Sequence, residues 1–232
     1  MSNLRGLNQS DGGNHVLTIT VGDGAAFGEQ CETVNTDPAV RAARILLSGN
    51  DATQPGLAAI LATVVTPVVA GLSGDVDDAV LELALSADVR LCEAGATFAI
   101  TQPQRGELPS DGGTQRLPRI VGQGLASDML LTGRRITAEE ALHAGLVTEI
   151  VPADDVPKRT HEIATEIAAH GQAAGRFTKE AVIEGADMSL HQSLHLETDL
   201  AILLHTDPER SEGIDAFNER RKPRFRGEDE DA

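Results

Sequence analysis

The chain has 232 residues, a length that suits one domain with a substantial hydrophobic core. Its formal net charge is -17, so we do not expect it to bind nucleic acid or anionic membranes. The two cysteines are too few for a disulfide framework or a zinc site, the histidines lack metal-ligand spacing, and no metal is expected. We find no signal peptide and no run of about 20 apolar residues, so we expect a cytoplasmic protein.

The balance of charged and aromatic residues is typical of a protein adapted to concentrated salt. Acidic residues number 36 against 19 Lys and Arg, the lysines are Lys158, Lys179 and Lys222, and aromatic residues make up 2%. Self-repulsion among carboxylates destabilises a compact chain unless counter-ions screen it, and the Debye length falls to about 3 Å at 1 M salt. Disorder is the competing interpretation, but 41% hydrophobic content and periodic segments argue against it.

The first half of the chain alternates expected strands and helices. After a polar start over residues 1–14 that we expect to be flexible, strands are expected at His15–Val21, Val40–Ser48, Val64–Gly71 and Ala87–Cys92. Helices are expected between them, near Ala25–Val34, Gly56–Thr63 and Asp78–Ser86. Crossover connections of this kind join parallel strands, so the sequence predicts an α/β fold with a mostly parallel sheet.

The second half is expected to be helical. Residues 137–140 have the pattern of a capping box, and Gly145 is placed to end that helix. Further helices are expected at Val156–His170, at Leu190–His205 and from Pro208 onward. The predicted organisation is an α/β core over 15–152, a helical region of the same domain over 153–225, and an acidic tail over 226–232.

Four segments in one order carry a family resemblance: LELALSADVRL, GGTQRLPRIVG, LTGRRITAEEALHAGLV and RRKPRF. From Ile45 to Phe225 the chain resembles the crotonase superfamily, the enoyl-CoA hydratases and isomerases. The resemblance implies ββα-type repeats around a mostly parallel sheet, with C-terminal helices that form trimers or dimers of trimers. It also implies an acyl-CoA thioester as substrate, with coenzyme A as part of that substrate and no further cofactor.

The resemblance places the family's two catalytic glutamates on Glu82 and Gln102. Adding water across the double bond of a thioester needs a base, an acid and donors for the enolate-like oxygen. Glu82 supplies one carboxylate, whereas glutamine at 102 can hold a water or a carbonyl but cannot transfer a proton at neutral pH. Asp111, just ahead of the Gly112-Gly113 turn, is a candidate for the missing acid; a turn-forming aspartate is the alternative.

The expected oxyanion hole is altered as well. Where the family has a run of glycines, this chain has residues 77–80 (DDAV), so the first N–H donor falls on Ala79. The second donor falls in a shortened loop, where Ala52 is the nearest candidate together with Asn50 and Asp51. Asp77 and Asp78 are alternatively helix-capping residues, and as carboxylates they oppose the charge that an oxyanion hole stabilises.

Arg221 and Lys222 lie in the dense basic segment of an acidic chain and could meet the phosphates of coenzyme A; cations at the end of a helix are the alternative interpretation. Two functional hypotheses follow. The first is an enoyl-CoA hydratase or isomerase that works with Glu82 as its family carboxylate. The second is a catalytically impaired crotonase-fold protein with a structural or acyl-CoA-binding role.

Overall fold

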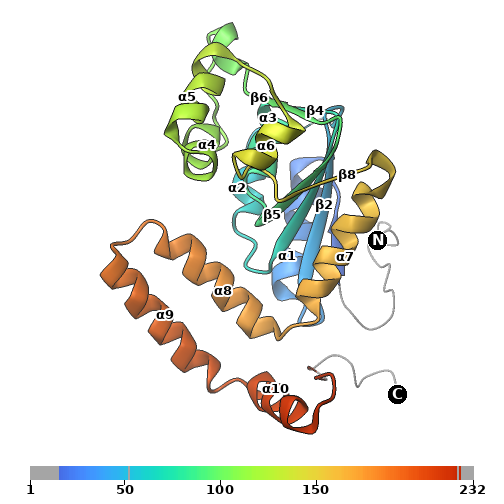
Figure 1. Ribbon diagram of the computed structural model, residues 1–232, viewed down its shortest axis with the longest axis vertical. Helices are drawn as coiled ribbons and strands as arrows, with labels where there is room; N and C mark the ends of the chain where they lie inside the picture. The colour runs from blue at the N-terminus through green and yellow to red at the C-terminus, as the bar shows by residue number, and fades with distance from the viewer. Residues whose placement is uncertain (1–15, 52, 224, 226–232) are drawn as a thin grey trace.

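The computed structural model describes residues 16–51, 53–223 and 225. Its main sheet has five parallel strands in the order β1-β2-β3-β5-β8 (Figure 1). Their bounds are Val16–Ile19, Ala42–Ser48, Val68–Ser73, Val89–Glu93 and Glu149–Val151. The expected flexible start over 1–14, residue His15 and the acidic tail over 226–232 lie outside the described residues.

A smaller sheet stands beside the main one and was not expected from the sequence. It comprises β4 (Asp75–Asp77), β6 (Thr97–Ala99) and β7 (Ile136–Thr137). β4 and β6 are parallel, and β6 and β7 are antiparallel. β4 leads without a gap into α3 (Asp78–Ala84), so this sheet fixes the start of the helix that carries Glu82.

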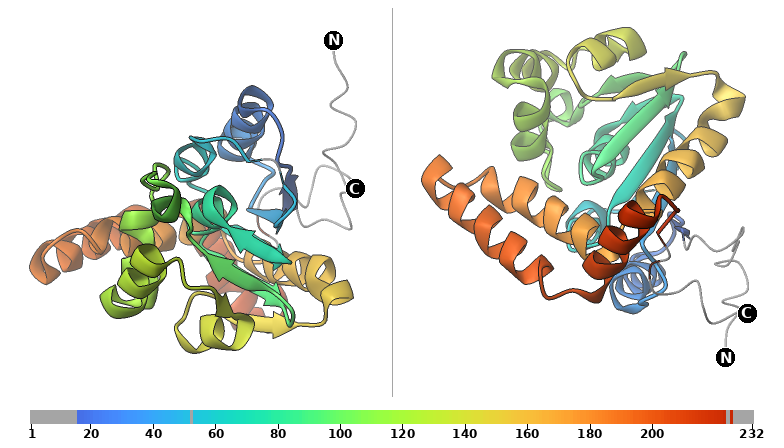
Figure 2. Two further views of the ribbon diagram at one scale, coloured as in Figure 1. Left: turned by 90° about the horizontal axis from the view of Figure 1, so that it is seen from above. Right: turned by 60° about the horizontal axis from the view of Figure 1, so that its bottom comes forward.

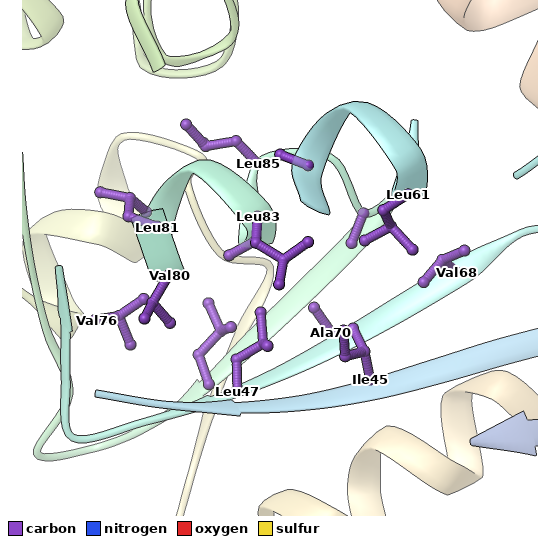
Figure 3. Packing of buried hydrophobic residues seen from close by; sticks show 14 of the residues in the cluster. Ile45, Leu47, Leu61, Val68, Ala70, Val76, Val80, Leu81, Leu83 and Leu85 are labelled. Carbon is purple, nitrogen blue, oxygen red and sulfur yellow. The ribbon is translucent and has the colours of Figure 1, made fainter. Parts of the chain in front are cut away.

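Helices cover both faces of the main sheet because its strands are apolar on both sides. On one face lie α1 (Gly24–Thr36), α2 (Leu57–Leu61) and α3, and Figure 3 shows Leu83 of α3 above Leu47 and Ala70 of the strands. On the other face lies α7 (Val156–Ala168), which follows the turn η2 (Ala153–Asp155). Gly71 permits this close approach, since a Cβ there would lie 2.3 Å from Thr160 Oγ1.

The middle of the chain forms a layer of short helices beside α3. This layer contains η1 (Gln102–Arg105), α4 (Gly113–Val121), α5 (Gln123–Thr132) and α6 (Ala138–His143). The capping box at the start of α6 is confirmed, with Thr137 and Glu140 bonding reciprocally, and Gly145 has the positive φ of 77° expected of a helix stop.

The C-terminal helices form an arm that leaves the core and returns to it (Figures 1 and 2). The arm contains α8 (Gln172–Gly185), α9 (Leu190–Leu204) and α10 (Pro208–Glu219). α10 is held against the core by Glu209, which accepts from Gln172 N at 2.7 Å and pairs with Arg41 at 3.6 Å. None of the helices over the described ranges is long and apolar enough to cross a membrane.

Candidate active site

Glu82 is a buried carboxylate in the middle of α3. The helix begins at the end of β4, and its apolar neighbours Leu81 and Leu83 are both fully buried. These neighbours draw the helix into the core, and the Glu82 side chain is left only 1% exposed. A carboxylate is buried at this depth only where it is hydrogen-bonded or paired, so its partners decide what it can do.

Three donors hold the Glu82 carboxylate. Oε1 accepts from the main-chain N–H of Asp111 at 2.9 Å and of Gly113 at 2.8 Å, at the start of α4. Oε2 accepts from the side-chain amide of Gln102 at 3.1 Å. A carboxylate offers about four acceptor positions, so a position on Oε2 stays open for a further hydrogen bond. The N-terminus of α4 also favours the negative charge of the Glu82 carboxylate.

Gln102 lies against Glu82, as the alignment of the two residues with the family's pair predicts. Its side chain is 9% exposed and comes from the first turn of η1. Its amide nitrogen donates to Glu82, and its amide oxygen Oε1 is buried without a partner among the described residues. A buried acceptor without a partner is rare in native proteins and indicates a place where a water or a ligand can donate.

The Asp111 side chain serves another helix. Oδ2 accepts from the N–H groups of Gly56 and Ala58, each at 2.9 Å, and Oδ1 accepts from Ala59 N at 3.2 Å. The carboxylate therefore caps α2 from across the fold and points to main-chain donors. Asp111 reaches Glu82 through its main-chain N–H, a contact that the sequence alone does not indicate.

Asp78 opens α3 and contacts the segment before Gln102. Its Oδ1 accepts from Thr101 N at 2.5 Å and its Oδ2 from Arg105 Nη2 at 3.0 Å. Burial of the Asp78 carboxyl acts to raise its pKa, but hydrogen bonds from Thr101 and Arg105 outweigh this effect, and the pKa lies below its ordinary value. The capping interpretation of Asp77 is not supported, since its side chain makes no cap hydrogen bond and pairs with Arg135 instead.

Ala79 is half-buried and occupies the first turn of α3. An N–H in the first turn of a helix has no carbonyl of its own helix to bond. Ala52, the other expected donor, lies outside the described residues. Its neighbour Asp51 is engaged locally, and its carboxylate accepts from Ser48 N at 2.6 Å.

A surface hollow of about 450 Å³ lies beside the ends of β2 and β3 but does not include the catalytic candidates. Its lining contains neither Glu82 nor Gln102, and it consists of Ser48, Gly49, Asn50, Gly74, Asp75 and Asp77. Two carboxylates in the lining oppose a phosphate or a thioester oxygen. We therefore assign no ligand to the hollow.

The basic pair near the C-terminus is not brought to Glu82 within one chain. Figure 1 shows α10 at the opposite end of the molecule from α3. Arg221 pairs with Glu212 and Glu219, and hydrogen bonds to both carboxylates raise its pKa above the ordinary range. Lys222 is exposed. Across the described ranges, no three His, Cys, Asp or Glu side chains come together as a metal site.

The chain is similar to known proteins in both sequence and fold. The family model described as Enoyl-CoA hydratase/isomerase matches residues 32–228. The 2,3-dehydroadipyl-CoA hydratase of Escherichia coli (strain K12) is 38% identical over 175 residues, which cover 75% of this chain and 69% of that protein. The (E)-benzylidenesuccinyl-CoA hydratase of Thauera aromatica is 37% identical over 161 residues, 69% of this chain and 63% of that protein.

The Crotonyl-CoA hydratase of Syntrophomonas wolfei is 36% identical over 159 residues, which cover 68% of this chain and 61% of that protein. The chain therefore spans less than two thirds of the length of some of the curated relatives that it matches. Among solved structures, the enoyl-CoA hydratase from Bacillus anthracis superposes with a TM-score of 0.85 at 27% identity, covering 95% of this chain and 98% of that chain. The α/β fold with a mostly parallel sheet is therefore confirmed. The chain belongs to the enoyl-CoA hydratase/isomerase family.

Proposed function

We propose that the chain binds an acyl-CoA thioester and acts on its carbon–carbon double bond, with Glu82 as the group that moves a proton. The observation that carries this proposal is the buried Glu82 carboxylate, which three donors hold in place while a position on Oε2 stays open. The Ala79 N–H at the start of the same helix is the proposed donor to the thioester oxygen. Coenzyme A enters as part of the substrate, and no further cofactor is proposed.

Isomerisation of the double bond suits this site better than hydration. In isomerisation Glu82 removes a proton from the carbon next to the thioester of a 3-enoyl-CoA, and the electron pair is held as a dienolate. The same carboxyl group then returns the proton to the far carbon of that dienolate, giving a 2-enoyl-CoA. Hydration needs a second proton-transfer group, and glutamine at 102 supplies none. Loss of one general acid or base lowers a rate by about 10²–10⁴.

A second candidate function is acyl-CoA binding without turnover. It is favoured by Gln102 and by the carboxylates of Asp77 and Asp78, which stand next to the proposed oxyanion donor. In this case the chain would still bind a CoA ester, and the amide oxygen of Gln102 would accept a hydrogen bond from a water or a ligand hydroxyl. Both candidate functions include binding of a CoA ester, but only the first includes its conversion.

We also propose that the C-terminal arm joins copies of this chain into trimers or dimers of trimers. Support comes from α8 and α9, whose one buried residue is Leu200. Large apolar side chains of both helices are exposed instead, among them Val182 at 68%, Leu190 at 76% and Ile202 at 60%. An apolar surface of this kind marks an interaction site. A role for Arg221 and Lys222 in binding coenzyme A, and a cytoplasmic location, complete the proposal.

The test compares two substrates and two variants in multimolar KCl. A 3-enoyl-CoA and crotonyl-CoA are given to the wild type, to Glu82→Gln and to Glu29→Gln, an exposed change of the same kind on α1. We expect the wild type and Glu29→Gln to isomerise the 3-enoyl-CoA. In Glu82→Gln the isomerisation rate should be about 10²–10⁴-fold lower. Binding with no turnover of either ester would favour the second candidate, and neither binding nor turnover would refute both.

A further inference from the structure

Gln102 is held by α3 at two points that lie one turn apart. Its main-chain N–H donates to Asp78 Oδ1 at 3.3 Å, and its side-chain amide donates to Glu82 Oε2 at 3.1 Å. Asp78 and Glu82 are four residues apart in the sequence, so they lie one above the other on the same face of the helix. The position of residue 102 relative to the Glu82 carboxylate therefore depends on Asp78.

From this arrangement we propose that Asp78 is a positioning residue, which sets the amide of Gln102 against Glu82. The proposal rests on the proposed function, because it assigns Asp78 to the same site. Asp78 does not touch the reacting atoms; it fixes the loop that carries Gln102. With that loop fixed, the amide nitrogen of Gln102 faces Glu82 and its unpartnered oxygen stays available to a ligand.

Neighbouring contacts make this anchor rigid. Thr101 donates to Asp78 through its main-chain N–H and through its hydroxyl, the latter at 3.0 Å from Oδ2. Arg105 bonds both partners, with Nη1 2.8 Å from Thr101 Oγ1 and Nη2 3.0 Å from Asp78 Oδ2. The guanidinium also compensates the negative charge of Asp78, which stands next to the Ala79 N–H. The low pKa of Asp78 agrees with a carboxylate that accepts all of these donors.

The backbone of Asp78 makes the proposal testable without breaking the fold. Its φ is 45°, in the left-handed region that glycine adopts readily and other residues adopt rarely. Asp78→Gly therefore keeps this backbone conformation and removes only the carboxylate. Arg220, with φ of 55°, provides Arg220→Gly as a control for the effect of the same backbone change on melting temperature.

The experiment is a double-mutant cycle with Asp78→Gly, Gln102→Ala and the double variant, assayed for kcat and KM on a 3-enoyl-CoA. We expect Asp78→Gly to lower kcat by about 10- to 100-fold with KM nearly unchanged, because Gln102 holds Oε2 of the catalytic Glu82 carboxylate and a small displacement of that carboxylate has a cost of this size. In the Gln102→Ala background the same change should have almost no further effect, because the group that Asp78 positions is gone. Full additivity, or an unchanged kcat in Asp78→Gly, would overturn the proposal.

A second readout does not depend on turnover. The side-chain amide hydrogens of Gln102, identified in NMR spectra by their absence in Gln102→Ala, should exchange slowly with solvent in the wild type and at least about tenfold faster in Asp78→Gly. If the wild type neither binds nor converts a CoA ester, the proposed function fails and this measurement still tests the anchor. Equal exchange rates in the two proteins would overturn it.

Discussion

Gly113 is the position where a single methyl group tests whether Glu82 must be held in place. A Cβ added to Gly113 would lie 3.0 Å from Glu82 Oε1 and 3.1 Å from both Glu82 Cγ and Ile100 Cδ1, so these neighbours would have to move by a few tenths of an ångström. Overpacking of this kind costs about 1–3 kcal/mol. Replacing a helical glycine by alanine returns about 0.5–1 kcal/mol. We therefore expect Gly113→Ala to lower the free energy of unfolding by about 1 kcal/mol.

The same shift should have a larger effect on catalysis than on stability. A misplacement of about 1 Å in a catalytic group can reduce turnover by about 10²-fold. The matched control is Gly124→Ala on α5, where an added Cβ meets nothing within 4 Å. The assay is kcat on a 3-enoyl-CoA beside urea unfolding in KCl. A Gly113→Ala variant with wild-type kcat would refute the claim that the α4 start positions the carboxylate.

Four further predictions follow. Gln102→Glu supplies a second carboxyl beside Glu82 and should raise the rate of crotonyl-CoA hydration by about 10²-fold or more, measured by loss of enoyl absorbance. An unchanged rate would show that the missing acid does not limit hydration. Asp111→Ala leaves the N–H groups at the start of α2 without their acceptor and should lower unfolding free energy by about 2 kcal/mol in urea. Its kcat should stay close to wild type, whereas a loss near 10²-fold would make Asp111 catalytic. The pKa of Asp78 is lowered in the folded state, so its stabilisation is present above the ordinary value of about 3.9 and is lost as pH falls through the folded value. The melting-temperature difference between wild type and Asp78→Asn should thus shrink below about pH 4, and a constant difference would contradict it. With a net charge of -17, the protein should lose its circular dichroism signal on dialysis from KCl into dilute buffer, and an unchanged signal would refute salt dependence.

The sequence predicted four of the five strands of the main sheet because they are apolar, whereas β8, with three residues, was not expected. The strand expected at Val40–Ser48 is found at Ala42–Ser48, and the strand expected at Ala87–Cys92 is found at Val89–Glu93. The strand expected from Val64 begins only at Val68, because residues 64–67 are irregular and the Val65 N–H donates to the Asn35 side chain instead of a neighbouring strand. The small sheet was missed since its strands have two or three residues, too few for a periodic pattern.

Helix α8 was also missed, since it starts after Gly171, which makes no side-chain cap hydrogen bond and gives no clear start signal. The helix expected at Leu190–His205 is found at Leu190–Leu204, where the capping residue Ser189 marks the start clearly. How the arms of separate copies meet stays a prediction.

Within the site, the sequence could place single residues but not their partners. Glu82 and Gln102 were paired by the family register, and the contact between them is found. Asp111 could not be assigned, because the helix it caps lies more than 50 residues earlier in the chain. The hydrogen bond from Thr101 to Asp78 joins residues that are 23 apart in the sequence. It also depends on the left-handed backbone of Asp78, which no sequence pattern predicts. Long-range contacts of this kind follow from the fold and not from local sequence.

The most direct test of the account is hydrogen exchange at the substrate carbon that Glu82 is proposed to deprotonate. A 3-enoyl-CoA is incubated in D₂O containing KCl with the wild type, Glu29→Gln or Glu82→Gln, and deuterium next to the thioester is followed by NMR. We expect exchange with the wild type and with Glu29→Gln, and an exchange rate about 10²–10⁴-fold lower with Glu82→Gln. Undiminished exchange with Glu82→Gln, or none with a wild type that binds the ester, would contradict it.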